Sequence, residues 1–164
     1  MIQRTAIFPG SFDPFTRGHE ALIHQALRLF DKVIVGIGNN PSKEGLLTVE
    51  ARKRLIDDYY AGNARVEAMS YGGMTGDFAQ QVGAAAVIRG VRNTTDFDVE
   101  YQMALINRGI HPELETLLLP ASAEYQHFSS SMAREMIRYH QPLEKYLPAS
   151  IVPLVREMTE KKEG

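Results

Sequence analysis

The segment from Gly10 to His19 combines residue types that bind phosphate. It follows the apolar run 6–8 and leads into a helix that we expect to begin near Gly18. Gly10 lets a backbone approach a phosphate closely, Ser11 offers a hydroxyl, and the free N–H groups of a helix start attract anions. His19, in the first turn of that helix, can donate a hydrogen bond to the same anion. Taken alone, the segment also fits an ordinary strand-turn-helix connection with a surface histidine.

A run of three serines, Ser129 to Ser131, opens another expected helix after the last expected strand. Their hydroxyls, together with the N–H groups of the helix start, suit the β- and γ-phosphates of a nucleotide. Serine is also a favoured N-cap residue, so such a run can serve helix initiation alone.

Basic side chains stand near the ends of two other expected strands. Lys43 follows one of them, and Arg89 directly follows an apolar run, where a charge is costly unless it meets an anion or a partner. A dianionic substrate phosphate is a sufficient reason for Arg89. In isolation, Lys43 could be a solvated surface charge, and Arg92 could form only an ion pair with Glu100.

Short apolar runs bounded by Gly, Pro or charge predict buried strands. These runs cover residues 6–8, 33–37, 85–88 and 117–119, with a weaker strand at 65–69. Apolar residues at helical spacing predict helices over about 22–30 and 51–59, the second with Thr48 as its N-cap. A third helix is predicted from about Thr95 to Arg108, and a fourth after the serines. The residues at core spacing in the third helix are Phe97, Tyr101, Ala104 and Leu105.

Strands that alternate with helices imply right-handed crossovers and a parallel sheet. We therefore expect an α/β fold, a Rossmann-like parallel sheet with helices on both faces. One domain would cover residues 1–164, with a C-terminal helical tail at about 143–164. Such sheets bind ligands beyond the carboxyl ends of their strands, where the strand order reverses, so function should lie in the loops that follow the strands.

The composition excludes several classes of function. The 164 residues include 18 Lys and Arg against 20 Asp and Glu, so a net charge of -2 gives no overall attraction to nucleic acid or to an anionic membrane. The absence of cysteine excludes disulfides and thiol chemistry. No apolar run approaches the roughly 20 residues of a membrane span, and no signal peptide is evident. We expect a cytoplasmic protein.

Five strings along the chain resemble known family motifs. Thr16-x-Gly18-His19 resembles the (H/T)xGH signature of the nucleotidyltransferase superfamily, and residues 128–131 resemble its ISSS pattern with Phe in place of Ile. Residues 41–43, 88–92 and 96–100 resemble the PSK, IRGxR and DFxxE elements of the phosphopantetheine adenylyltransferase family. The strings occur in the expected order over about residues 5 to 140. The resemblance implies the nucleotidyltransferase fold.

The resemblance also implies roles for individual residues. The catalytic residues would be His19, Lys43 and Arg89. ATP would be bound by Ser11, Phe12, His19, Gly90, Arg92, Glu100, Tyr125, Ser129, Ser130 and Ser131. Phosphopantetheine would be bound by Ser11, Lys43, Met74, Thr75, Arg89 and Asn107.

The reaction implied by the resemblance is the reversible transfer of AMP from ATP to 4′-phosphopantetheine, giving dephospho-coenzyme A and pyrophosphate in a late step of coenzyme A biosynthesis. Mg²⁺ would arrive with ATP, and we expect no metal ligand from protein side chains because the motifs lack carboxylates at metal-cage spacing. The family further implies feedback inhibition by coenzyme A and a homohexamer.

Two alternatives stay open. The chain could be a related nucleotidyltransferase with another acceptor or donor, such as nicotinamide mononucleotide or a cytidylyl donor, or a silent nucleotide-binding module on the same fold. The sequence departs from the family pattern at Ser11, where Thr is commoner, at Val99, where an aromatic residue is expected, and at Glu44 and Gly45, which make the loop after Lys43 less positive.

Overall fold

The structure, a computed structural model, describes residues 3–163. Five strands form one parallel sheet: β1 (Thr5–Gly10), β2 (Lys32–Gly38), β3 (Val66–Tyr71), β4 (Ala86–Val91) and β5 (Glu115–Pro120). Their order in the sheet is β3-β2-β1-β4-β5, and every neighbouring pair is parallel. The chain moves outward in one direction from β1 to β3 and in the other from β4 to β5. The strand order therefore reverses between β1 and β4, which is where ligands bind in sheets of this kind.

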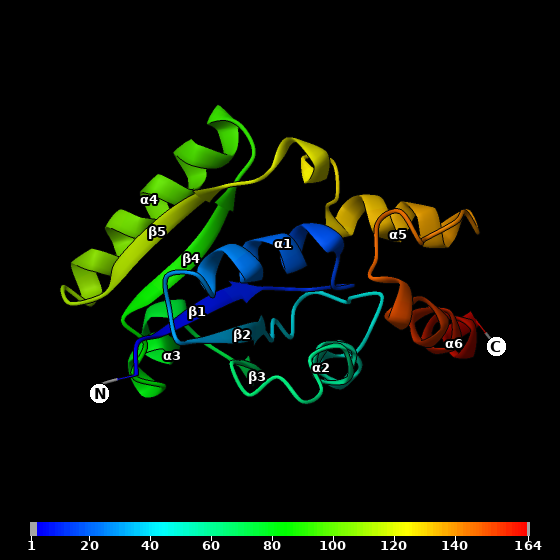
Figure 1. Cartoon of the computed structure of the whole chain (residues 1–164), viewed down its shortest axis with the longest axis horizontal. Coiled ribbons are helices and arrows are strands. Elements are labelled where there is room, and N and C mark those ends of the chain that lie inside the picture. Colours follow the sequence, from blue (N-terminus) through cyan, green and yellow to red (C-terminus); the bar gives the residue numbers. More distant parts are fainter. Residues whose placement is uncertain (1–2, 164) are drawn as a thin grey trace.

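Helices connect and follow the strands: α1 (Arg17–Ala26), α2 (Val49–Tyr59), α3 (Thr75–Gln81), α4 (Thr94–Ile110), α5 (Ser130–Arg138) and α6 (Val152–Glu163). Short 3-10 turns, η1 (Ala123–Tyr125) and η2 (Ala149–Ile151), precede the last two. Figure 1 shows α4 beside β4 and β5 at one end of the molecule, with α5 and α6 at the opposite end. The predicted strands and the four predicted helices are confirmed, whereas α3 was not predicted because its seven residues carry too short a pattern.

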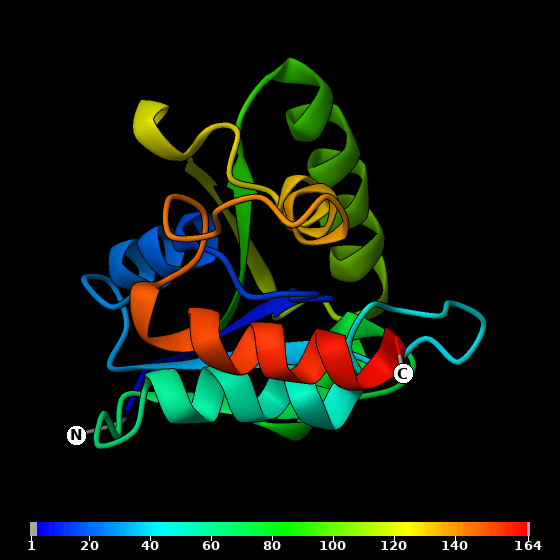
Figure 2. The ribbon, with the colours of Figure 1, turned by 90° about the vertical axis from the view of Figure 1, so that its right-hand side faces the viewer.

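Helices cover both faces of the sheet, as expected. Alternate strand residues point to opposite sides, so Phe8 and Val35 join one buried cluster while Ile7 and Ile34 join another. The first cluster includes side chains of α1, α2, α5 and α6, and the second includes Phe78 of α3. In Figure 2, α2 and α6 lie side by side in front of the strands.

The prediction that the apolar stripe of α4 faces the core is wrong for this chain. Phe97, Tyr101 and Leu105 are each about half exposed, Ala104 is partly buried, and Asn107 is the buried residue of the helix. Helical spacing shows that apolar residues share one face, but it does not say what covers that face. In the described chain the side chains of Phe97, Tyr101 and Leu105 therefore lie largely open to solvent.

The expected helical tail is present as α6, and Gly164 lies outside the described residues. Leu143, Leu147, Ile151 and Val155 of this region are fully buried in the main core cluster. The Arg17 side chain, at the start of α1, donates to the backbone oxygen atoms of Glu144 and Leu147. The tail is therefore packed against the element that carries His19.

Candidate active site

A cavity of about 310 Å³ opens between the carboxyl ends of β1 and β4, at the reversal of strand order. Most of the residues predicted to bind ATP line it: Ser11, Phe12, His19, Gly90, Arg92, Glu100, Tyr125, Ser129 and Ser130. Arg89, predicted to bind the acceptor phosphate, lines it as well. Segments more than 100 residues apart along the chain thus meet in the central cavity.

The start of α1 fixes His19. Thr16 is the N-cap, and its fully buried side chain accepts a hydrogen bond from the backbone N–H of His19. The backbone N–H of Thr16 donates in return to Nδ1 of His19, with 3.0 Å between the two nitrogen atoms. An N–H group can only donate, so Nδ1 must be unprotonated and the neutral ring carries its proton on Nε2.

The surroundings of His19 keep the ring neutral. The imidazole packs against Phe12 and Phe15, with ring centroids 4.7 Å and 5.8 Å away. Burial, with the positive charges of Arg89 and Arg92 as smaller causes, lowers the pKa of His19 to about 3. At neutral pH His19 is therefore uncharged, with its ring proton on Nε2.

Two arginine-carboxylate pairs line the same cavity. Arg89 forms a two-pronged pair with Glu100, at 2.6 Å and 2.7 Å, and its Nη1 donates to the backbone oxygen of Pro9 at 2.6 Å. Arg89 lies inside β4, which runs to Val91, so the expectation that it directly follows the strand is wrong. The side chain of Arg92 pairs with Asp96 at 2.8 Å, so its partner is Asp96 in place of Glu100. The guanidinium of Arg92 holds the pKa of Asp96 below its usual range.

The hydroxyls of the three predicted serines have separate partners. Ser129 is the N-cap of α5 and accepts from the N–H of Met132. Ser130 donates to the backbone oxygen of Pro14 at 2.8 Å, while the Ser131 hydroxyl accepts from Arg134 at 3.1 Å. Ser131 is not among the residues that line the central cavity.

The two phosphate-binding motifs are joined directly. Thr16 Oγ1 donates to the backbone oxygen of Phe128 at 3.0 Å, which ties the start of α1 to the segment before the serines. Gly18 is needed at this contact because a Cβ there would lie 2.9 Å from the same oxygen. The N-terminal ends of α1 and α5 are thereby held against one another beside the central cavity.

A second, narrower cavity of about 150 Å³ lies beside the central one, and residues of α4 line it. Pro9, Gly10, Arg89 and Glu100 line both cavities. Thr75 and Asn107, predicted to bind phosphopantetheine, line the narrower cavity, whereas Met74 is 42% exposed and does not. Thr116 was not predicted, yet its buried hydroxyl lines this cavity and has no hydrogen-bond partner among the described residues.

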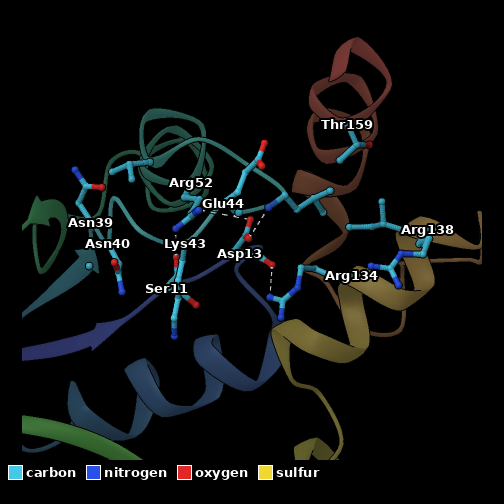
Figure 3. A pocket seen from close by; sticks show the side chains of 15 residues that line it. Ser11, Asp13, Asn39, Asn40, Lys43, Glu44, Arg52, Arg134, Arg138 and Thr159 are labelled. Atoms are coloured by element: carbon cyan, nitrogen blue, oxygen red, sulfur yellow. Dashed lines mark hydrogen bonds and ion pairs between the residues drawn. The ribbon is translucent and has the colours of Figure 1, made fainter. Parts of the chain in front are cut away.

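Lys43 lies apart from the central cavity, on the loop between β2 and α2. It lines a third cavity of about 790 Å³, and Ser11 lines both this cavity and the central one (Figure 3). Of the three predicted catalytic residues, His19 and Arg89 line the central cavity. Lys43 lines the third cavity, which shares Ser11 with the central one.

Asp13 and Arg52 anchor the loop that carries Lys43. The buried carboxylate of Asp13 accepts from the backbone N–H groups of Leu46 and Leu47, each at 2.8 Å. Arg52 lies 3.5 Å from the same carboxylate and donates to the oxygen of Leu47. At Gly45 a Cβ would overlap the guanidinium of Arg52, so this departure from the family pattern makes room for the anchor.

Four residues that line these cavities were not predicted from the sequence: Asp13, Arg52, Arg134 and Thr116. Asp13 sits inside a recognised motif and offered a signal, because a carboxylate in a buried loop needs donors. Arg52 and Arg134 lie on helices whose pattern looks like that of an ordinary solvated face, so no local signal marked them.

Comparisons with known proteins agree with the geometry. Residues 7–136 match the family model described as cytidylyltransferase-like. The chain is 40% identical over 163 residues to the phosphopantetheine adenylyltransferase of Streptococcus gordonii, covering 99% of both chains. It belongs to the phosphopantetheine adenylyltransferase family. Another member of the family, from Anaeromyxobacter sp. (strain K), is 38% identical over 151 residues, covering 92% of each chain.

Solved structures share the fold of this phosphopantetheine adenylyltransferase family member. A crystal structure of a bifunctional NMN adenylyltransferase/ADP-ribose pyrophosphatase from Francisella tularensis, in complex with AMP and a manganese ion, has a TM-score of 0.72 at 16% identity. The match covers 99% of this chain and 50% of that one. At this identity the likeness establishes the nucleotidyltransferase-like fold, as predicted.

Two further findings concern metals and membranes. Among residues 3–163 no group of three or more His, Cys, Asp or Glu side chains is placed to hold a metal ion. No helix in the same part of the chain has the length and apolar character needed to cross a membrane.

Proposed function

We propose that the protein transfers AMP from ATP to 4′-phosphopantetheine, yielding dephospho-coenzyme A and pyrophosphate. The observation that carries this proposal is that two cavities share Arg89 and Glu100 as lining residues. One holds the nucleotide-binding motifs. The other leads away toward Asn107 and Thr116, whose amide and hydroxyl groups suit the amides of a pantetheine arm.

The chemistry is an in-line displacement. An oxygen of the substrate phosphate forms a bond to the α-phosphorus of ATP, and the bond from that phosphorus to the bridging oxygen of pyrophosphate breaks. The attacking phosphate is already ionised at neutral pH, so no base is required. His19 would donate its Nε2–H to the charge that develops on the α-phosphate, which is the kind of preorganised donor that accelerates such reactions.

Other side chains would position the substrates. Arg89 would orient the attacking phosphate from its place between the two cavities, and Lys43 would approach the phosphates from the loop after β2. Arg92 and the N-terminal end of α5 would hold the nucleotide. The partner carboxylates, Glu100 and Asp96, keep both guanidinium groups in place before substrate arrives.

Mg²⁺ would enter with ATP. Phosphate oxygens and water would supply most of the ligands of the ion. Its role would be to neutralise phosphate charge.

Regulation and assembly are also proposals. Coenzyme A, which resembles the product, would inhibit by occupying both cavities. Residues 1–164 would act as one cytoplasmic domain that assembles into a homohexamer. The exposed apolar side chains of α4 support assembly, because Phe97, Tyr101 and Leu105 would be buried between copies. Light scattering on the purified protein would measure the mass, and a monomer would contradict this proposal.

A pyrophosphate-release assay tests the function. ATP with 4′-phosphopantetheine should release pyrophosphate, whereas CTP as donor or nicotinamide mononucleotide as acceptor should release little. Preference for either alternative would identify a related nucleotidyltransferase. No release with any combination would favour a silent nucleotide-binding module.

A further inference from the structure

The end of α4 carries a histidine that lies outside all the functional motifs. His111 is the C-cap of this helix, and its backbone N–H donates to the backbone oxygen of Asn107 at 2.7 Å. Residues four positions apart lie on one side of a helix, so His111 stands on the same side of α4 as Asn107. Asn107 is the buried residue of α4 and lines the narrower cavity.

His111 joins α4 to the neighbouring helix α3. Its Nε2 lies 2.7 Å from Oδ1 of Asp77, and because a carboxylate accepts, Nε2 is the donor. The imidazole also packs against Gly76, where a Cβ would stand 2.5 Å from Cδ2 of His111 and 3.6 Å from the side-chain oxygen of Asn107. The lack of a side chain at Gly76 therefore lets the ring lie directly on the backbone of α3.

The sheet holds the opposite side of α3. Phe78 is buried in the second core cluster and stacks on Tyr71, with 4.4 Å between the ring centroids. The hydroxyl of Tyr71 lies 2.9 Å from the hydroxyl of Thr75, at the start of the helix. The short helix α3 is thus attached to the sheet by aromatic side chains and to the end of α4 by His111.

These contacts bear on the narrower cavity because both helices contribute to its walls. Thr75 of α3 and Asn107 of α4 line it, whereas Asp77 and His111 do not. Asp77 follows Thr75 by two residues, and His111 follows Asn107 by four. The hydrogen bond between Asp77 and His111 therefore fixes the two walls relative to each other from outside the cavity.

We propose that His111 is a positioning residue for the acceptor substrate. Through Asp77 and Gly76 it sets the spacing between Thr75 and Asn107, and so the fit of the pantetheine arm in the narrower cavity. This inference rests on the proposed function for the identity of the arm. The binding of pantetheine can nevertheless be measured without turnover.

Calorimetric titration with pantetheine, which has the arm but lacks the phosphate, tests the role of His111. His111→Ala should weaken pantetheine binding about threefold to tenfold, because the hydrogen bond that fixes the two walls is lost. The KM for 4′-phosphopantetheine should rise by a similar factor, while kcat and the KM for ATP stay within about twofold. His111→Gln keeps a side-chain N–H donor and should recover part of the affinity.

Further variants separate positioning from folding. Asp77→Ala should weaken pantetheine binding in the same direction, and His111→Ala should add little in that background. Because the carboxylate of Asp77 is largely exposed, its pair with His111 should contribute little to global stability, which thermal unfolding measures. Arg108→Gln breaks an exposed pair with Glu115 in the last turn of α4 and is the matched control that should change nothing.

The outcomes distinguish this inference from the proposed function. Unchanged pantetheine affinity in both His111→Ala and Asp77→Ala would overturn the positioning role. Equal weakening toward ATP and pantetheine would overturn it as well, because the effect would then not be confined to the acceptor arm. If the variants lose affinity for pantetheine while no combination of substrates releases pyrophosphate, the proposed function fails and the positioning role stands.

Discussion

The backbone N–H of Thr16 donates to Nδ1 of His19, and this bond decides which nitrogen of the neutral ring can act as a donor. Because Nδ1 is occupied, Nε2 carries the proton. The same capping arrangement that starts α1 therefore also sets the chemistry of the candidate catalytic residue.

Replacing His19 by Ala should lower kcat about a hundredfold to a thousandfold, with much smaller changes in either KM. One preorganised donor to a developing charge contributes about 2.7 to 4 kcal/mol, and it acts mainly in the transition state. Steady-state kinetics with both substrates varied provide the measurement. His19→Gln and His19→Asn keep an N–H donor and should retain more activity than His19→Ala. A His19→Ala enzyme with unchanged kcat would exclude the proposed role.

The stability of the fold should fall in mild acid because of His19. In the unfolded chain the pKa of His19 would be about 6.5, whereas in the fold it is about 3. Between these values the unfolded state binds a proton that the native state does not, so stability declines as the pH falls below about 6.5 and gains nothing from this group above it. The slope from one group is at most about 1.4 kcal/mol per pH unit.

Urea unfolding at several pH values between about 7 and 5 measures this slope. His19→Gln should show a shallower decline than the parent protein. His24→Gln, on the exposed side of the same helix, is the matched control. Identical slopes for His19→Gln and the parent protein would show that His19 does not titrate as its surroundings imply.

Replacing Arg89 by Ala should raise the KM for phosphopantetheine more than the KM for ATP. The lost charged hydrogen bond corresponds to about 1.5 to 3 kcal/mol, or roughly tenfold to a hundredfold in affinity. The change also leaves Glu100 without its partner, and this carboxylate would repel phosphate. Arg89→Ala combined with Glu100→Gln should therefore recover part of the loss. Arg108→Ala, which breaks an exposed pair with Glu115, serves as control, and equal weakening toward both substrates would refute the assignment.

Asp13 should act on the reaction through Lys43. Asp13→Asn weakens the anchor of the loop after β2, and we expect lower kcat in the folded enzyme together with reduced stability. If Asp13 works by placing Lys43, then in a Lys43→Ala background Asp13→Asn should reduce kcat little further. Thermal unfolding separates the loss of stability from the loss of rate. If the two substitutions lower kcat in a fully additive way, Asp13 does not act on the reaction through Lys43.

The sequence by itself determined the parts of the protein whose causes are local. Apolar runs of strand length, the Thr48 cap and the serine cap of α5 depend on neighbours within a few residues, so they were readable directly. The motifs at His19 and the serines indicated phosphate binding because each one follows a strand of a parallel sheet. Arg89 indicated it because a charge at the end of an apolar run is costly without an anion or a partner.

The tertiary structure decided what depends on groups far apart in the chain. It paired Arg92 with Asp96 and Arg89 with Glu100, and it left the apolar side of α4 uncovered. It also tied Thr16 to Phe128 across 112 positions and placed Arg134 beside Asp13. Spacing along one helix or strand shows which side chains share a face. The packing of the whole sheet and its helices decides which partner meets that face and which charge stays free for a ligand.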